Sequence, residues 1–229
     1  MSRLRVLVYN VHQLRAGVGP VARVIGHLEP DVALLAETGP RWRLRRLGRL
    51  LGMQVARDPW SPLRRRVRNA VLARPPWQVR AHRLHRFADV RRPWNPRGAL
   101  VAELSGPDGP RLSVCAVHLG LHPLERLHAA RELLALELPH PAIIGGDLNE
   151  LPDGRAVAEL SRRLVDVWTV AGDGPGQTFP ARAPTARIDY LFVSPGIRVE
   201  RVLVPELPEA RGASDHLPLL AELSVEDAG

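Results

Sequence analysis

The stretch Ile-Ile-Gly-Gly-Asp-Leu-Asn at residues 143–149 constrains this chain more than any other. Ile143 and Ile144 are β-branched and favour a buried strand, which we expect to end with them. Two glycines follow, and a backbone without Cβ atoms can turn sharply and let another segment approach closely. Asp147 and Asn149 are two residues apart, so on an extended path their side chains point the same way. Such a pair suits holding and deprotonating a water beside a metal-bound phosphate, although Asp and Asn in loops also stabilise turns.

Length and composition indicate one globular domain. The chain has 229 residues, of which 45% are hydrophobic and 24% charged, and we find no linker, so we predict a single domain over residues 1–229. No apolar run is long enough to cross a membrane, and the N-terminus has no signal-peptide pattern, which predicts a cytoplasmic protein. Cys115 is the only cysteine, which excludes an internal disulfide and a cysteine-based zinc site.

The charge balance is basic and depends entirely on arginine. Lys plus Arg number 32 and Asp plus Glu 24, a net charge of +8, and the sequence contains no lysine. A basic surplus favours polyanionic partners such as nucleic acid, or an anionic membrane surface. The alternative is a compositional bias, since the chain is also rich in alanine and proline. Charge alone leaves both interpretations open.

Hydrophobic patterning predicts many strands with helices scattered between them. The mixed order favours one α/β domain with stacked sheets and outer helices. Residues 58–68, 91–97 and the Gly-rich 171–177 look like loops. We expect strands at 3–10, 31–37, 69–74, 77–84, 98–104, 111–118, 187–193, 197–204 and 217–224, and helices at 20–29, 40–51, 123–137 and 154–163.

Polar side chains recur where the predicted strands end or begin. Burying so many carboxylates, amides and imidazoles without partners would be costly, and a shared site at one rim of the sheets would satisfy them. Each residue also has a simpler interpretation: Asn10 as a turn cap, Glu37 as a cap or ion-pair partner, His118 as a hydrogen-bonded core histidine. The recurrence of the same few residue types at the same structural place favours the shared site. The residues are Asn10, His12, Glu37, His118, Asp147, Asn149, Asp189, Asp215 and His216.

Six of these stretches together resemble the endonuclease/exonuclease/phosphatase superfamily, the deoxyribonuclease-like metal-dependent phosphoesterases. Gly-Asp-x-Asn at 146–149, Arg-Ile-Asp-Tyr at 187–190 and Ser-Asp-His at 214–216 follow one another in the order typical of that superfamily. The other matching segments are residues 6–12, 30–37 and 116–119, so the resemblance runs from the first strand to the last.

The resemblance implies a fold and a set of roles. The fold is a four-layer α/β sandwich of two packed mixed β-sheets flanked by helices. Glu37, with Asn10 and Asp215, would hold a divalent cation, Mg²⁺ or Mn²⁺. Hard oxygen ligands suit such a cation, which assists in-line displacement at phosphorus. Catalysis would fall to Asp147 as base for the attacking water, Asn149 as a phosphate or water ligand, His216 as a donor to the phosphate supported by Asp189 or Asp215, and His118 as a second phosphate-side imidazole.

Substrate selection is the most open part of the prediction. Ala36 stands before Glu37 where many relatives carry glutamine, and the chain has little room for the insertions of larger relatives. The two Arg- and Trp-rich loops, which include Arg91, Trp94 and Arg97, are the best candidates for substrate contact together with His12, because arginine grips phosphates and tryptophan stacks on bases.

A nuclease or nucleic-acid phosphodiesterase is therefore the first hypothesis. A phosphodiesterase or phosphatase on lipid headgroups or inositol phosphates is the alternative, and it would require exposed apolar residues near the site. A catalytically inactive binding domain is the third, and the filled acidic and imidazole positions argue against it. Nothing in the sequence indicates an obligate protein partner.

Overall fold

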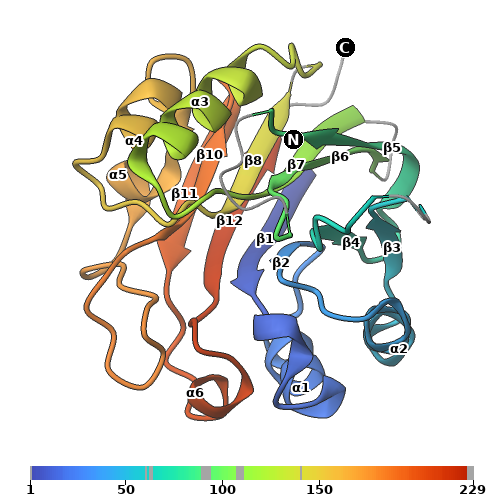
Figure 1. Ribbon diagram of the computed structural model, residues 1–229. Coiled ribbons are helices and arrows are strands. Elements are labelled where there is room, and N and C mark those ends of the chain that lie inside the picture. Colours follow the sequence, from blue (N-terminus) through green and yellow to red (C-terminus); the bar gives the residue numbers. More distant parts are fainter. Residues whose placement is uncertain are drawn as a thin grey trace.

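Two six-stranded sheets pack face to face in the computed structural model, which describes residues 2–59, 61, 64–88, 94–106, 111–139 and 141–225 (Figure 1). In the first sheet the strand order is β11-β12-β1-β2-β4-β3, formed by Ile197–Leu203, Leu219–Val225, Ser2–Asn10, Val32–Ala36, Ala70–Ala73 and Gln54–Arg57. In the second the order is β5-β6-β7-β8-β10-β9, formed by Gln78–Arg86, Gly98–Ser105, Arg111–His118, Ala142–Asp147, Asp189–Val193 and Val165–Asp166.

Both sheets are mixed. The β1–β2 and β7–β8 pairs are parallel, whereas the other pairs in these sheets are antiparallel. The helices are α1 (Val18–Leu28), α2 (Arg41–Leu51), α3 (Pro123–Leu134), α4 (Arg155–Leu160), α5 (Val167–Ala171) and α6 (Ala210–Ala213), with a 3-10 turn at His12–Leu14.

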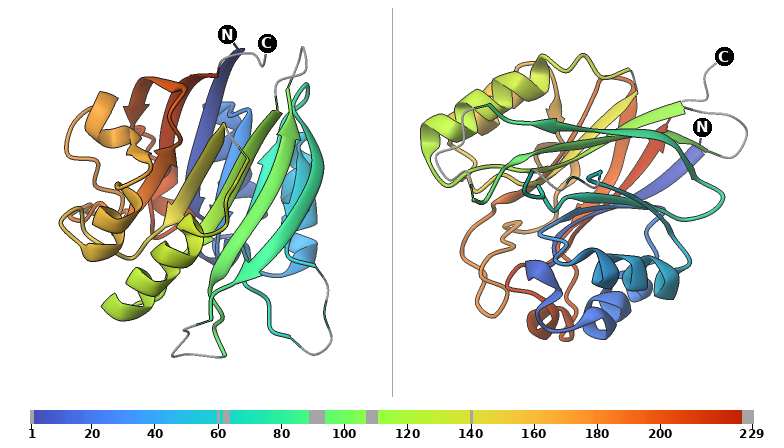
Figure 2. Two further views of the ribbon diagram at one scale, coloured as in Figure 1. Left: turned by 90° about the horizontal axis from the view of Figure 1, so that it is seen from above. Right: turned by 45° about the vertical axis from the view of Figure 1, so that its right-hand side comes forward.

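Three hydrophobic clusters make this a four-layer sandwich. The central cluster joins the inner faces of the sheets, for example Val8 and Leu34 with Leu191. A second cluster packs α1 and α2 onto the outer face of the first sheet, and a third packs α3 and α4 onto the second sheet. Figure 2 shows these helices on opposite sides of the paired sheets. The predicted fold class is therefore confirmed.

The two glycines before Asp147 lie inside β8, so the expected strand end after Ile144 is wrong. A Cβ atom on Gly145 would lie 2.7 Å from Val8 and 2.9 Å from Leu34, both in the facing sheet. Gly146 has a φ of +154°, and a Cβ there would overlap the Val117 carbonyl. The expected close approach of another segment is present, but it occurs within the strand.

The register of the strands explains why polar residues meet. His118 and Asp147 are paired at the ends of parallel β7 and β8, and antiparallel β10 begins at Asp189 directly opposite Asp147. In the first sheet Asn10 ends β1 beside Ala36, the last residue of β2. Carboxyl ends of parallel strands share an edge with the amino ends of their antiparallel neighbours, so these groups collect at one rim.

Several boundaries differ from those expected. The last strand begins at Leu219, so Asp215 and His216 lie in the preceding turn, and Asp189 starts β10 where a strand from residue 187 was expected. Short elements β3, β9, α5 and α6 were not predicted, because two to five residues carry too little periodicity to identify. No helix in the described residues is both long and apolar enough to cross a lipid bilayer.

Candidate active site

Asp147 lies at the centre of the polar rim and is 2% exposed. Its Oδ2 accepts a hydrogen bond from Asn10 Nδ2 at 2.9 Å, which spans the two sheets. The same oxygen lies 3.4 Å from His118 Nε2 and 3.7 Å from His216 Nε2. Residues separated by more than 100 positions therefore converge on one carboxylate oxygen.

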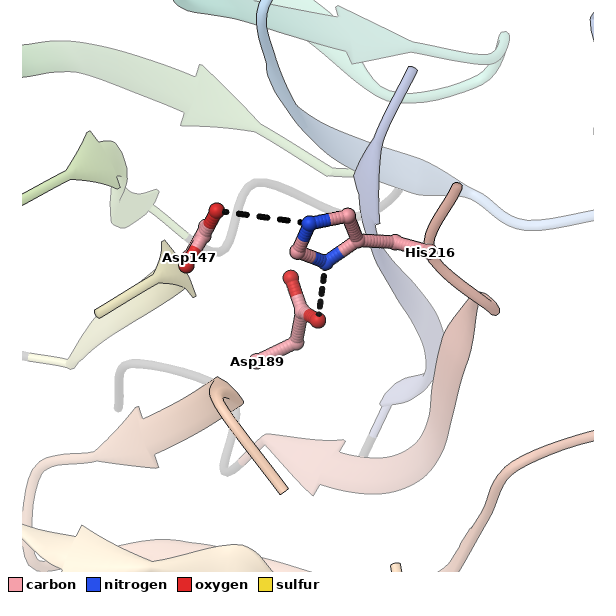
Figure 3. Close-up of side chains that lie close together, drawn as sticks. All are labelled: Asp147, Asp189 and His216. Carbon is pink, nitrogen blue, oxygen red and sulfur yellow. Dashed lines mark hydrogen bonds and ion pairs between the residues drawn. The ribbon is translucent and has the colours of Figure 1, made fainter. Parts of the chain in front are cut away.

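Asp189 and His216 form a buried pair beside it (Figure 3). His216 Nδ1 donates to Asp189 Oδ2 at 2.7 Å, which leaves Nε2 directed toward Asp147. Asp189 is fully buried, and its Oδ1 accepts no hydrogen bond from the described residues. The Phe179 ring packs against His216 with 4.9 Å between centroids, which fixes the imidazole from a further direction.

Burial and neighbouring charge give the two groups unusual pKa values. Burial raises the pKa of Asp147 to about 6, and the negative charge of Asp189 adds to this rise. For His216 burial opposes the charged form, but the facing carboxylates of Asp189, Asp147 and Asp215 outweigh burial and raise the pKa to about 9. A carboxylate near its titration point thus lies beside an imidazolium at neutral pH.

His118 behaves differently from His216. Burial and the nearby positive charge of Arg97 hold its pKa well below the usual range, so the ring is neutral. Arg97 Nη1 donates to His118 Nδ1 at 2.7 Å, and because a guanidinium only donates, the ring proton is on Nε2, facing Asp147. Arg97 was predicted to contact substrate, and it is placed at the site through His118.

Asn149 adopts a left-handed conformation with φ of +51°, so the expected extended path from Asp147 to Asn149 is wrong. Its backbone N–H donates to Asp147 Oδ1 at 2.9 Å, a local turn that orients the carboxylate. The side-chain Nδ2 lies 3.1 Å from the Leu119 carbonyl oxygen and 3.2 Å from His118 Nε2. Asn149 therefore both forms a local turn and has its own side chain at the site.

The remaining rim residues come from the first sheet and the turn before β12. Asn10 Oδ1 accepts from the His12 backbone N–H, and His12 Nδ1 lies 3.5 Å from Asp215 Oδ1. Ser214, which was not among the predicted site residues, donates its hydroxyl to the Asn10 carbonyl at 2.6 Å and so ties this turn to β1. Its position before Asp215 was visible in the sequence, whereas nothing in the sequence indicated that Phe179 would contact His216.

Two groups of residues have the chemistry to hold a divalent cation. Asp147, Asp189 and His216 place one ligand atom each within 4.8 Å of one another. However, His216 Nδ1 and Asp189 Oδ2 already bond to each other at 2.7 Å. Glu37 follows Ala36 at the end of β2 with φ of +52°, and within the described residues its carboxylate makes no hydrogen bond or ion pair. An unpartnered carboxylate next in sequence to Ala36, the strand partner of Asn10, fits a hard cation.

The Arg- and Trp-rich loops are described only in part, since Trp60, Arg91 and Arg92 lie outside the described residues. The described parts of the two loops are in contact, since Arg65 Nη1 lies 3.5 Å from the Trp94 carbonyl oxygen. The Trp94 side chain is exposed. Together they line a pocket of about 230 Å³ with Gln13, Gly39, Pro40, Arg66, Arg68 and Asn95. Gln13 donates its backbone N–H to the Glu37 carbonyl, so this pocket lies beside Glu37.

The chain is similar in sequence to a known protein family. The sequence profile of the Endonuclease/Exonuclease/phosphatase family matches residues 7–216. The uncharacterized protein YbhP of Escherichia coli K12 is 33% identical over 139 residues, which are 56% of this chain and 53% of YbhP. The match thus spans about half the length of that relative.

Solved structures share the whole fold. An endonuclease/exonuclease/phosphatase from Bacteroides vulgatus has a TM-score of 0.83 at 18% identity, covering 99% of this chain and all of the other. A mannosyl-6-phosphatase from Bacteroides thetaiotaomicron has a TM-score of 0.78 at 21% identity, covering 96% of this chain and 99% of the other. At these identities the likeness concerns the fold.

Proposed function

Because the chain belongs to the endonuclease/exonuclease/phosphatase family and is thereby a phosphoester hydrolase, we propose that it is a divalent-metal-dependent phosphodiesterase acting on nucleic acid. The observation that carries the reaction is the position of Asp147, whose Oδ2 faces Asn10, His118 and His216 at once. A carboxylate with a pKa near 6 is suited to accept a proton from the attacking water at neutral pH.

The residues around Asp147 have complementary roles. Asn10 and the Asn149 backbone orient the carboxylate toward the water. His216, held charged by Asp189, donates through Nε2 to a phosphate oxygen and stabilises the negative charge that develops there. His118, kept neutral beside Arg97, offers a second N–H on the same side.

Glu37, Asn10 and Asp215 would hold the cation, with Mg²⁺ or Mn²⁺ as the ions that suit oxygen ligands. When bound, such an ion polarises the phosphoryl group. We place the cation at these residues in preference to Asp147, Asp189 and His216, because His216 and Asp189 are already hydrogen-bonded to each other.

Nucleic acid is favoured as substrate by the pocket between the two loops. Arg65 and Arg68 provide phosphate ligands, and exposed Trp94 provides a face on which a base can stack. The net charge of +8 attracts a polyanion to this surface.

One observation favours the alternative substrate class. Leu121 and Leu151, which follow His118 and Asn149 by three and two residues, are 54% and 51% exposed. Arg126 links the two segments, since it donates to the Leu121 carbonyl and pairs with Glu150. Exposed leucines on this side of the rim would suit a lipid headgroup substrate, and a mannosyl-6-phosphatase with the same fold shows that monoesters also belong in the comparison.

A substrate panel tests the proposed function. Purified protein with Mg²⁺ or Mn²⁺ is assayed against DNA, RNA, sphingomyelin, inositol phosphates, a sugar phosphate and bis-nitrophenyl phosphate. Cleavage of DNA or RNA with the highest kcat/KM supports the nucleic-acid assignment. A clear preference for sphingomyelin, inositol phosphates or a sugar phosphate would transfer the assignment to the alternative class.

Metal removal gives a direct prediction for the same assay. Excess EDTA is expected to abolish hydrolysis, because the cation at Glu37 neutralises phosphate charge that the imidazoles alone do not offset. Added Mg²⁺ or Mn²⁺ should restore the rate. Full activity in excess chelator would contradict the metal-dependent mechanism.

Salt dependence gives a second prediction. Affinity for single-stranded DNA should fall steeply as salt rises, because each phosphate contact releases condensed counterions. The dissociation constant is measured by fluorescence anisotropy between about 50 and 200 mM salt, a range over which several contacts produce a large change. Absence of binding at low salt, combined with cleavage of small phosphoesters, would exclude the nucleic-acid assignment.

A further inference from the structure

A second basic pocket lies at the start of α2, separate from the loop pocket that contains Trp94. It has a volume of about 390 Å³, and its charged lining comes from α2, β3 and β5. These groups are Arg41, Arg45, Arg57 and His82, with Asp58 as the single acid. Three guanidiniums from two consecutive elements, α2 and β3, therefore line one hollow, which His82 of β5 closes from another part of the chain.

The acid in this pocket is shared with a further arginine, Arg66, so it offsets only part of the positive charge. Asp58 is fully buried and bonded by Arg66, whose Nε lies 3.0 Å from Oδ1. The Arg41 side chain donates to the Asp58 carbonyl oxygen. The side chains of Arg45 and Arg57 make no hydrogen bond or ion pair within the described part of the chain. Burial lowers the pKa of the Arg57 guanidinium, and the charges of Arg45 and Arg41 lower it further. The pocket thus holds three guanidiniums beside one carboxylate, and that carboxylate is already paired with Arg66.

The pocket adjoins the catalytic rim through Arg66. Arg66 Nη1 donates to the Gly39 carbonyl, and both residues line the Trp94 pocket beside Glu37. On its other side Arg66 holds Asp58, which lines the second pocket. A basic surface therefore continues from the polar rim that contains Asp147, past Trp94, to the start of α2.

We propose that the pocket lined by Arg41, Arg45 and Arg57 binds a backbone phosphate of a single-stranded nucleic acid whose scissile phosphate lies at Asp147. The inference rests on the proposed function and adds that the substrate is a polymer held at two places. The Arg45 and Arg57 side chains, which bond to no described residue, gain a counterion when a phosphate enters, and arginine offers the planar donors that phosphate oxygens accept. A dinucleotide has one internal phosphate, so it cannot occupy the catalytic rim and this pocket together.

The test compares Arg45→Ala/Arg57→Ala with a matched control, Arg23→Ala/Arg46→Ala. Each double variant removes two charges, and the control residues are exposed on α1 and α2 without lining either basic pocket. All proteins carry Asp147→Asn so that the probe, a fluorescein-labelled 20-nucleotide DNA strand, stays intact during anisotropy measurements. Dinucleotide hydrolysis is measured separately, on versions of the same proteins that retain Asp147.

Loss of both pocket arginines is expected to weaken 20-mer binding at least about tenfold at low salt. It should also lower the slope of log affinity against log salt by about 0.7, the value for one phosphate contact on a single strand. The control should change affinity less than about twofold by comparison, since long-range charge is screened. Dinucleotide turnover and melting temperature should not fall in either variant, because the removed groups repel one another.

Equal losses of 20-mer affinity in both double variants would mean that diffuse charge attracts the strand, and would overturn the proposed phosphate site. Unchanged affinity in the pocket variant, or no 20-mer binding by the parent protein, would overturn it as well. These results are distinguishable from failure of the proposed function. If the pocket variant alone loses affinity while no nucleic acid is cleaved, the pocket stands and the proposed reaction fails. If dinucleotides are cleaved while the pocket variant binds normally, the reaction stands and the pocket fails.

Discussion

Replacing Asp147 by asparagine is expected to lower turnover at least about 100-fold, in line with the contribution of a general base. The amide keeps the size of the side chain but cannot accept the proton of the attacking water. Stability should change little, because the loss of an acceptor for Asn10 is offset by relief of repulsion with Asp189. Turnover per folded molecule and melting temperature are measured on the same purified protein.

Asp166→Asn is the matched control for this change. Asp166 is also buried, but it pairs with Arg187 at 2.9 Å and lies opposite Phe192, three residues along β10 from Asp189. Breaking this ion pair should lower the melting temperature with little effect on turnover. If Asp147→Asn instead shows this control pattern, the Asp147 carboxylate has a structural role and is not the base.

Replacing His216 by alanine is expected to reduce turnover by a comparable factor and, in addition, to destabilise the protein. The variant loses the donor to the transition-state charge, which is typically worth 100-fold or more. It also leaves Asp189 fully buried without its partner, since Oδ1 has none among the described residues and Oδ2 is bonded by His216. Removing one member of a buried pair costs about 3–5 kcal/mol of unfolding free energy.

A double variant separates the two effects. Asp189→Asn/His216→Ala removes the stranded charge, so the melting temperature should recover much of its loss while turnover stays low. Recovery of turnover together with stability would show that His216 acts only by neutralising Asp189. Circular dichroism melts and initial rates on the same samples provide both readouts.

The sequence by itself determined the fold class and the candidates for the site. Buried strands interrupted by scattered helices require two sheets with outer helices, and polar residues at the ends of such strands need one another. Asp147, Asp189, His118 and His216 could therefore be named together, and the structure brings them into contact. Their catalytic roles remain predictions until the variants are measured.

The pairing of these residues was decided only by the tertiary structure. Strand register places Asp189 opposite Asp147, and the packing of one sheet on the other brings Asn10 to Asp147 across 137 positions. Neighbouring charges then separate two similarly buried histidines that the sequence could not distinguish, because burial and Arg97 keep His118 neutral while carboxylates keep His216 charged. Both the register and the burial depend on contacts between distant segments, and a pattern of neighbouring residues contains no information about them.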